Sequence, residues 1–163
     1  MKKFFLSLTL LVLFVIQTSI GDKLKIFSVS PNLILIFVIL FSMNTSVLKS
    51  ALLGLVCGLL TDSMGFWVIG YNALFMMYIG ILTSVMSSRY YFETKLITFI
   101  IVFVFTFIFG FINAVVSSVI VSKLPVWYIT YRYILFECVY NSCVALAISP
   151  LVKRLKIEYV RGI

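Results

Sequence analysis

Two acidic residues inside apolar stretches are the strongest candidates for chemistry in this sequence. Asp62 ends the run GLVCGLLTD, and Glu137 lies about one turn inside a later apolar segment. Carboxylates in such positions can relay protons, bind a cation or hold a basic ligand. Each acid also has a simpler interpretation, in which Asp62 caps a turn and Glu137 reaches the membrane interface or pairs with Arg132.

The other residue types narrow the chemistry further. The sequence contains no histidine, and Cys57, Cys138 and Cys143 lie in apolar segments without a CxxC pair, which is typical of reduced packing residues. Dinucleotide-binding, phosphate-binding, zinc-protease and serine-hydrolase motifs are absent from the sequence. We therefore expect no catalytic residues, no metal site, no cofactor and no enzymatic activity.

The composition places the chain in a membrane. Of 163 residues, 63% are hydrophobic and 11% are charged, with a mean hydropathy of +1.21. A water-soluble domain of this size could not bury so much apolar surface. The net charge of +8 comes from residues in short loops and tails, so it indicates membrane topology and not nucleic-acid binding.

Six segments approach the length of about 20 apolar residues that a spanning helix needs. We expect an all-α integral membrane protein with six transmembrane helices in one bundle, forming a single multi-pass domain over residues 1–163. Pro31 would fall in the opening turn of the second helix. The expected spans are 4–20, 26–43, 47–61, 69–86, 96–121 and 133–151.

The distribution of basic residues decides between two topologies. The third segment is short and could dip into the bilayer, which would leave five spans and an outward basic tail. Six spans with cytoplasmic termini put nine Lys and Arg inside and four outside, as the positive-inside rule favours. The first segment also resembles a secretory signal, but its apolar core is long and we expect it to be retained as a transmembrane helix.

Small and polar residues mark the faces that should turn toward other helices. In the third segment Ala51, Gly54, Gly58 and Asp62 follow at intervals of three or four, which predicts close helix packing along one face. Similar lines occur in the last three segments. Their members are Asn72, Gly80 and Ser84; Thr106, Gly110, Asn113 and Ser117; and Glu137, Asn141 and Ala145.

The orientation places six polar residues in the outer half of the bilayer. They predict a shared polar cluster that opens outward and organises the bundle. The six residues are Gln17, Asp62, Asn72, Asn113, Glu137 and Asn141.

Residues 30–84 resemble a known family. SPNLILIFVIL, ALLGLVCGLLTDSMG and GYNALFMMYIGILTS are similar to the second to fourth helices of the rod shape-determining MreD family. The shared order is a proline before an apolar helix, a glycine-rich helix ending in Asp, a glycine-containing turn, and Asn-Ala-Leu opening the next helix. The matching positions here are Pro31, Gly54, Gly58, Asp62, Gly70 and Asn72.

The resemblance implies a non-enzymatic scaffold of the bacterial cell-elongation machinery, involved in cell shape and lateral peptidoglycan synthesis. Its implied partners are an MreC-like periplasmic protein, the glycan polymerase RodA with its transpeptidase, and indirectly the MreB filament. The turn DSMGFWVIGYN is bulkier than the family's usual turn. Phe66 and Trp67 are therefore candidate contacts for a partner or for lipid headgroups.

The family fold is also similar to the substrate-binding component of energy-coupling-factor vitamin transporters. This gives an alternative function, in which the outer polar cluster binds a vitamin. A membrane protein without either function is the third possibility. Under the scaffold hypothesis, Asp62 fixes the turn into the fourth helix and shapes the surface that a partner uses.

Overall fold

The computed structural model describes the backbone of residues 2–20, 29–63, 70–89, 94–121 and 127–160, with side-chain surroundings for 9–19, 29–63, 70–88, 94–116, 133–150 and 152. All regular elements in these residues are α-helices. They are α1 (Lys2–Ile20), α2 (Leu33–Ser42), α3 (Val47–Asp62), α4 (Tyr71–Arg89), α5 (Lys95–Val121) and α6 (Trp127–Val160).

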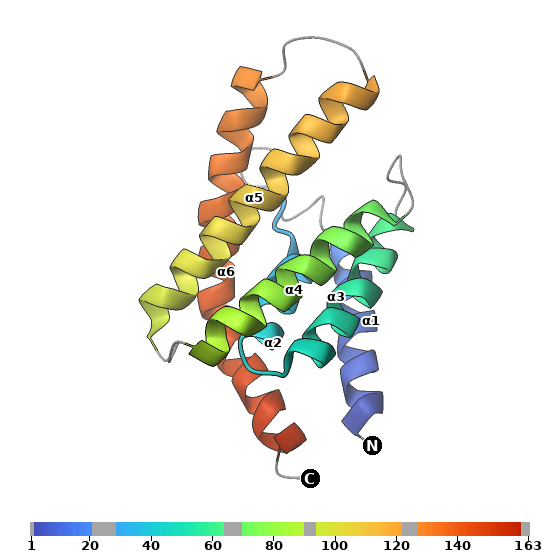
Figure 1. Ribbon diagram of the computed structural model, residues 1–163, viewed down its shortest axis with the longest axis vertical. Helices are drawn as coiled ribbons and strands as arrows, with labels where there is room; N and C mark the ends of the chain where they lie inside the picture. Colours follow the sequence, from blue (N-terminus) through green and yellow to red (C-terminus); the bar gives the residue numbers. More distant parts are fainter. Residues whose placement is uncertain (1, 21–28, 64–69, 90–93, 122–126, 161–163) are drawn as a thin grey trace.

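The helices form a bundle in which consecutive helices run in opposite directions. Figure 1 shows both chain termini at the same end of the molecule. α3 packs along α4 and α5 packs along α6, while α2 contacts all five other helices. The bundle thus consists of two helical hairpins and α1, held together around α2.

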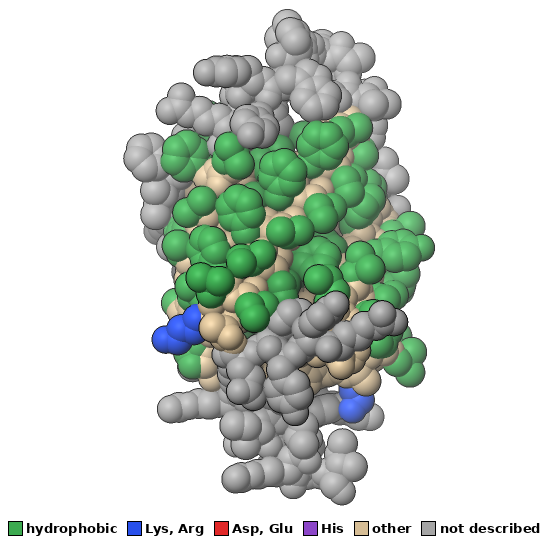
Figure 2. All heavy atoms as spheres, turned by 60° about the vertical axis from the view of Figure 1, so that its left-hand side comes forward, with side chains coloured by type: hydrophobic (Ala, Val, Ile, Leu, Met, Phe, Trp, Pro, Cys, Tyr) green, Lys and Arg blue, Asp and Glu red, His purple; other side chains and the backbone are tan. Residues whose placement is uncertain are grey.

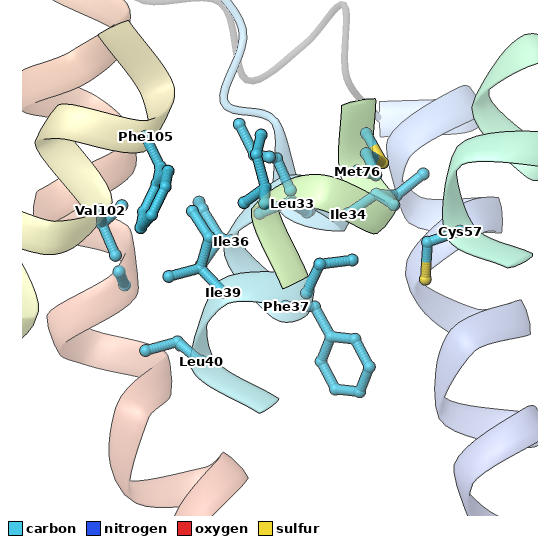
Figure 3. Packing of buried hydrophobic residues seen from close by; sticks show 14 of the residues in the cluster. Leu33, Ile34, Ile36, Phe37, Ile39, Leu40, Cys57, Met76, Val102 and Phe105 are labelled. Carbon is cyan, nitrogen blue, oxygen red and sulfur yellow. The ribbon is translucent and has the colours of Figure 1, made fainter. Parts of the chain in front are cut away.

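The sequence of α2 explains its central place. Its residues LILIFVIL are apolar on every side, and all eight are buried, four of them completely. A helix without a polar face is stable only where it is surrounded by other apolar groups. Figure 3 shows Ile36 and Ile39 facing Val102 and Phe105 of α5, with Met76 of α4 and Cys57 of α3 on the other side.

The start of α2 differs from the sequence-based expectation. The expected span began near residue 26, whereas the helix begins at Leu33, directly after Pro31 and Asn32. Asn32 has non-helical backbone angles and its side chain accepts a hydrogen bond from the Leu35 N–H, as an N-cap does. A helix of this length covers about 15 Å, roughly half of a bilayer's hydrocarbon core.

The outward faces of the bundle are apolar. On α3 and α4 exposed large side chains recur at intervals of three or four. Figure 2 shows hydrophobic side chains covering the middle of one face, with basic side chains toward its lower end. Soluble monomers rarely expose continuous apolar surface on this scale. The exposed stripes are Leu48, Leu52, Val56 and Leu59 on α3, and Leu74, Tyr78, Leu82 and Met86 on α4.

Two helices in the described residues are long and apolar enough to cross a bilayer by length and composition. They contain the stretches Lys95–Val116 of α5 and Tyr133–Pro150 of α6. Shorter apolar stretches occur at Thr9–Ser19 and Leu33–Ser42. By length and hydropathy, α5 and α6 are therefore the described helices best suited to cross a bilayer.

Glycines bring α3 and α4 into backbone contact. A Cβ atom at Gly58 would lie 2.5 Å from the Ala73 nitrogen, and one at Gly54 would lie 2.7 Å from the Met76 carbonyl carbon. On the facing helix, a Cβ at Gly80 would lie 2.6 Å from the Ser50 carbonyl oxygen. Real side chains do not tolerate such distances, so the α3–α4 packing requires glycine at all three positions.

Serines on α4 hold the turn between α2 and α3. The Ser84 hydroxyl donates to the Thr45 carbonyl at 2.7 Å, and the Ser87 hydroxyl donates to the Met43 carbonyl. Thr45 and Ser50 also share a hydrogen bond of 2.9 Å between their hydroxyls. The end of α4 and the start of α3 are thereby fixed to the end of α2.

Replacing Gly58 by leucine should destabilise the protein strongly. The added side chain meets backbone atoms of α4, which cannot move aside without separating the helices, so we expect a loss of about 3 kcal/mol or more. The measurement is the unfolding midpoint of the purified protein in detergent micelles.

The matched control is Leu59→Phe, which adds bulk at the neighbouring exposed position. Its free energy of unfolding should stay within about 0.5 kcal/mol of the wild-type value. A wild-type midpoint for Gly58→Leu would contradict the tight α3–α4 contact.

Candidate functional site

The Asp62 carboxylate binds the beginning of α4. Its Oδ2 atom accepts hydrogen bonds from the N–H groups of Gly70 at 2.9 Å and Ala73 at 3.2 Å. Its Oδ1 atom accepts one from the Asn72 N–H at 3.1 Å. The side chain is only 4% exposed, and its bonds to Asn72 and Ala73 are buried while the one to Gly70 is partly buried.

The first turn of α4 needs such an acceptor. N–H groups in the first turn of a helix have no carbonyl partner within the helix, and the helix dipole is positive there. Asp62 supplies a negative charge and two acceptor atoms from the end of the preceding helix, in bonds stronger than those between neutral groups. The acid in the glycine-rich stretch thus closes the α3–α4 hairpin.

Gly70 has the backbone conformation that this turn requires. Its φ angle is +94°, in the region that side chains strongly disfavour, and its carbonyl accepts the first hydrogen bond of the helix from the Leu74 N–H. Its N–H can then point back to Asp62. The glycine is therefore needed for its conformation, since a Cβ there would meet no atom within 4 Å.

Asn72 contributes to the turn through its backbone. Its side chain is fully buried, and within the described structure neither its Nδ2 nor its Oδ1 atom has a hydrogen-bond partner. Asn72 and Met76, one turn apart, are both completely buried. The Asn72 side chain thus lies on the inward face of α4.

A second set of hydrogen bonds surrounds the beginning of α2. Gln17 of α1 donates from Nε2 to the Pro31 carbonyl at 3.1 Å and accepts at Oε1 from the Leu33 N–H at 3.0 Å. One amide side chain therefore satisfies both a donor and an acceptor of the backbone where the chain enters α2. Pro31 itself has no backbone N–H, so it adds no further donor that would need a partner here.

Asn141 of α6 completes this set. Its Oδ1 atom accepts from the Asn32 N–H at 3.0 Å, and its Nδ2 atom lies 3.5 Å from the Thr106 hydroxyl of α5 as a donor. Glu137 lies one turn before Asn141 on the same side of α6. The fully buried Asn141 amide thus connects α2, α5 and α6.

The structure separates the polar residues named from the sequence. Gln17 and Asn141 belong to the network at the start of α2, with Glu137 one turn before Asn141, while Asp62 acts at the start of α4. Asn113 donates from its Nδ2 atom to the carbonyl of Phe109 at 2.9 Å, within its own helix. Phe66 and Trp67 lie outside the described residues.

Two residues of the α2 network were not singled out as site residues from the sequence. Asn32 could have been found, because an asparagine before an apolar helical run is a common N-cap signal. Thr106 was placed on an inward face only. Its contact with Asn141, 35 residues later in the chain, depends on how α5 meets α6.

The chemistry of both sets is structural. The acceptors and donors are used by backbone groups at helix starts, and the described residues hold no group of three metal-ligating side chains. Cys57 and Cys138 are buried and Cys143 is exposed, and all three are free thiols. The arrangement positions helices, and its outer surface is apolar.

These features define an α-helical bundle protein with an apolar exterior suited to a membrane. The sequence model of the family described as rod shape-determining protein MreD matches residues 1–156, and the chain belongs to this family. The resemblance drawn from residues 30–84 is confirmed and extends over almost the whole chain. Searches of curated proteins and of solved structures found no match. Membership implies a membrane location and a role in rod shape determination.

Replacing Asp62 by alanine should destabilise the hairpin by about 2–4 kcal/mol, because it leaves two buried N–H groups and one partly buried N–H group without this acceptor. Asp62→Asn keeps one oxygen and should cost less. The measurement is again the unfolding midpoint in detergent.

Ser63→Ala is the control, since the exposed Ser63 hydroxyl bonds only a carbonyl of its own turn and its loss should change the midpoint little. Equal midpoints for wild type and Asp62→Ala would show that the cap contributes nothing to stability.

Proposed function

We propose that the chain crosses the bacterial inner membrane six times with both termini in the cytoplasm. The alternating directions of the helices and the common end of the two termini support an even number of crossings (Figure 1). The shorter α2 is completed by residues before Leu33, whose backbone groups are bonded by Gln17 and Asn141. Non-helical backbone at membrane depth is tolerated where protein groups satisfy it.

Single-cysteine labelling tests this topology. In a variant with the three native cysteines replaced by alanine, a cysteine at Ser63 should react in intact cells with a thiol reagent that cannot cross the membrane. A cysteine at Thr94 should react only after the membrane is opened. Labelling of both sites from the same side would exclude six crossings.

We further propose that the protein is a non-enzymatic scaffold of the cell-elongation complex. It would bind an MreC-like periplasmic protein and, with it, RodA and its transpeptidase, with MreB engaged indirectly. The family match over residues 1–156 carries this proposal. The two polar sets support a scaffold role, since each fixes helix starts against neighbouring helices.

The α3–α4 hairpin would act as a rigid element of the scaffold. Glycine contacts fix the distance between its two helices. Asp62 binds the backbone where α3 passes into α4, and Ser84 near the end of α4 binds the turn before α3. A partner helix could then meet a surface that is already ordered, which lowers the entropic cost of binding. Asp62→Ala would weaken pairing by loosening this hairpin.

Co-purification from native membranes tests the scaffold function. A tagged wild-type copy, expressed in its own host in place of the native gene, should retain an MreC-like protein detectable by mass spectrometry, and cells should stay rod-shaped. Gly58→Leu should lose both the partner and the rod shape, whereas Leu59→Phe should keep both.

A different outcome would favour the vitamin-transporter alternative. Under that alternative, the denatured protein would release a bound small molecule, and an ATPase module would be recovered in place of the MreC-like partner. Recovery of neither class of protein would contradict both functions.

A further inference from the structure

We propose that Glu137 is a binding site, within the membrane, for a basic side chain on the transmembrane helix of a partner protein. This inference rests on the proposed scaffold function and assigns one contact of the partner to a particular place on α6.

Glu137 lies at the boundary between the buried and the exposed side of α6. Ile134, Cys138 and Asn141 on one side are buried, whereas Tyr133 and Phe136 on the other are 44% and 42% exposed. Glu137 itself is partly exposed. Its position in the apolar stretch Tyr133–Pro150 puts the carboxyl group beside the apolar exterior and within reach of a neighbouring helix.

Asn141, one turn after Glu137 on the same side of α6, is held in place by hydrogen bonds of its own. Because the Oδ1 atom of Asn141 accepts from the Asn32 N–H, the amide must present its Nδ2 donors to its other partners. One of these is Thr106 of α5. The Asn141 amide is therefore fixed by bonds to the start of α2 and to α5, and it carries no charge that could pair with Glu137.

Asp62 and Glu137 differ in how many of their acceptor positions are occupied within the described residues. Asp62 is buried and accepts three backbone hydrogen bonds, whereas within the described residues no side-chain hydrogen bond reaches the Glu137 carboxyl group. A carboxylate has acceptor positions for about four hydrogen bonds. Among the side chains that the structure describes, the two basic ones, Lys49 and Lys95, stand near the starts of α3 and α5, away from Glu137.

The chemistry of the unfilled positions selects the occupant. A carboxylate beside hydrocarbon is stabilised most by a cation that also donates hydrogen bonds, and a Lys or Arg on a neighbouring transmembrane helix is such a group. The same pairing would also relieve the partner of an unpaired charge in the membrane. Attraction of this kind selects both the partner and its depth in the bilayer.

Photo-crosslinking in native membranes tests the inference. A photoreactive phenylalanine analogue in place of Tyr133, one turn from Glu137, should crosslink to the transmembrane segment of the partner. The same analogue in place of Val139, on an exposed part of α6 away from this site, should crosslink lipid. Glu137→Gln should lower the crosslink at position 133 at least tenfold. Glutamine has nearly the same shape and size as glutamate, so the unfolding midpoint in detergent should not change.

A charge exchange makes the test specific. The crosslinked peptide identifies the basic residue of the partner, and Glu137→Lys combined with its replacement by glutamate should restore the crosslink that either change alone abolishes. If Glu137 pairs with Arg132 of its own chain, Arg132→Gln and Glu137→Gln will lower stability equally and leave the crosslink unaltered, which overturns the inference.

The outcomes separate this inference from the proposed function. An MreC-like partner that co-purifies equally with wild type and Glu137→Gln, without a crosslink at position 133, leaves the scaffold function standing and removes Glu137 from it. Absence of any partner from the wild-type preparation overturns both.

Discussion

The fold depends on satisfying the backbone at helix starts that are buried in an apolar bundle. The first N–H groups of a helix have no partner inside the helix, and away from water each unpaired group costs free energy. This chain meets the constraint twice with side chains from other helices. Asp62 of α3 serves α4, and Gln17 of α1 with Asn141 of α6 serves the start of α2.

The same bonds that remove this cost also position the helices. Asn141 joins its own helix to α2 and α5, so the α5–α6 hairpin cannot turn relative to α2 without breaking buried hydrogen bonds. On the other side, Met76 and Cys57 pack the α3–α4 hairpin against α2 (Figure 3). α2 is therefore the common core of two hairpins that contact each other little directly. An ordered exterior for binding a partner depends on this central helix.

In a bilayer an apolar exterior gives little preference for a partner helix over lipid, because lipid chains and apolar side chains make similar contacts with it. Selection of a partner then depends on shape and on the few polar groups near the surface. The glycine-fixed α3–α4 hairpin offers a defined shape, and Glu137 offers a charge. Both features are consistent with the proposed scaffold function.

The sequence by itself determined the local elements and their inward faces. Apolar runs gave the six helices because helix length and hydropathy are local properties, and the four-residue spacing of Gly54 and Gly58 indicated close packing before any partner helix was known. The motif in residues 30–84 was enough to identify the family. Pro31 and Asn32 also carried a local signal for the start of α2, although the expected span began near residue 26.

Only the tertiary structure decided which backbone groups the polar side chains serve. The bond from the Asn32 N–H to Asn141 joins residues 109 positions apart, and no periodicity in either segment specifies it. Helix packing put Gln17 and Asn141 at the start of α2 and Asp62 at the start of α4, while Asn113 bonds a carbonyl of its own helix. The physical reason is that hydrogen bonds act over about 3 Å, whereas a sequence pattern fixes only the face of a helix on which a residue lies.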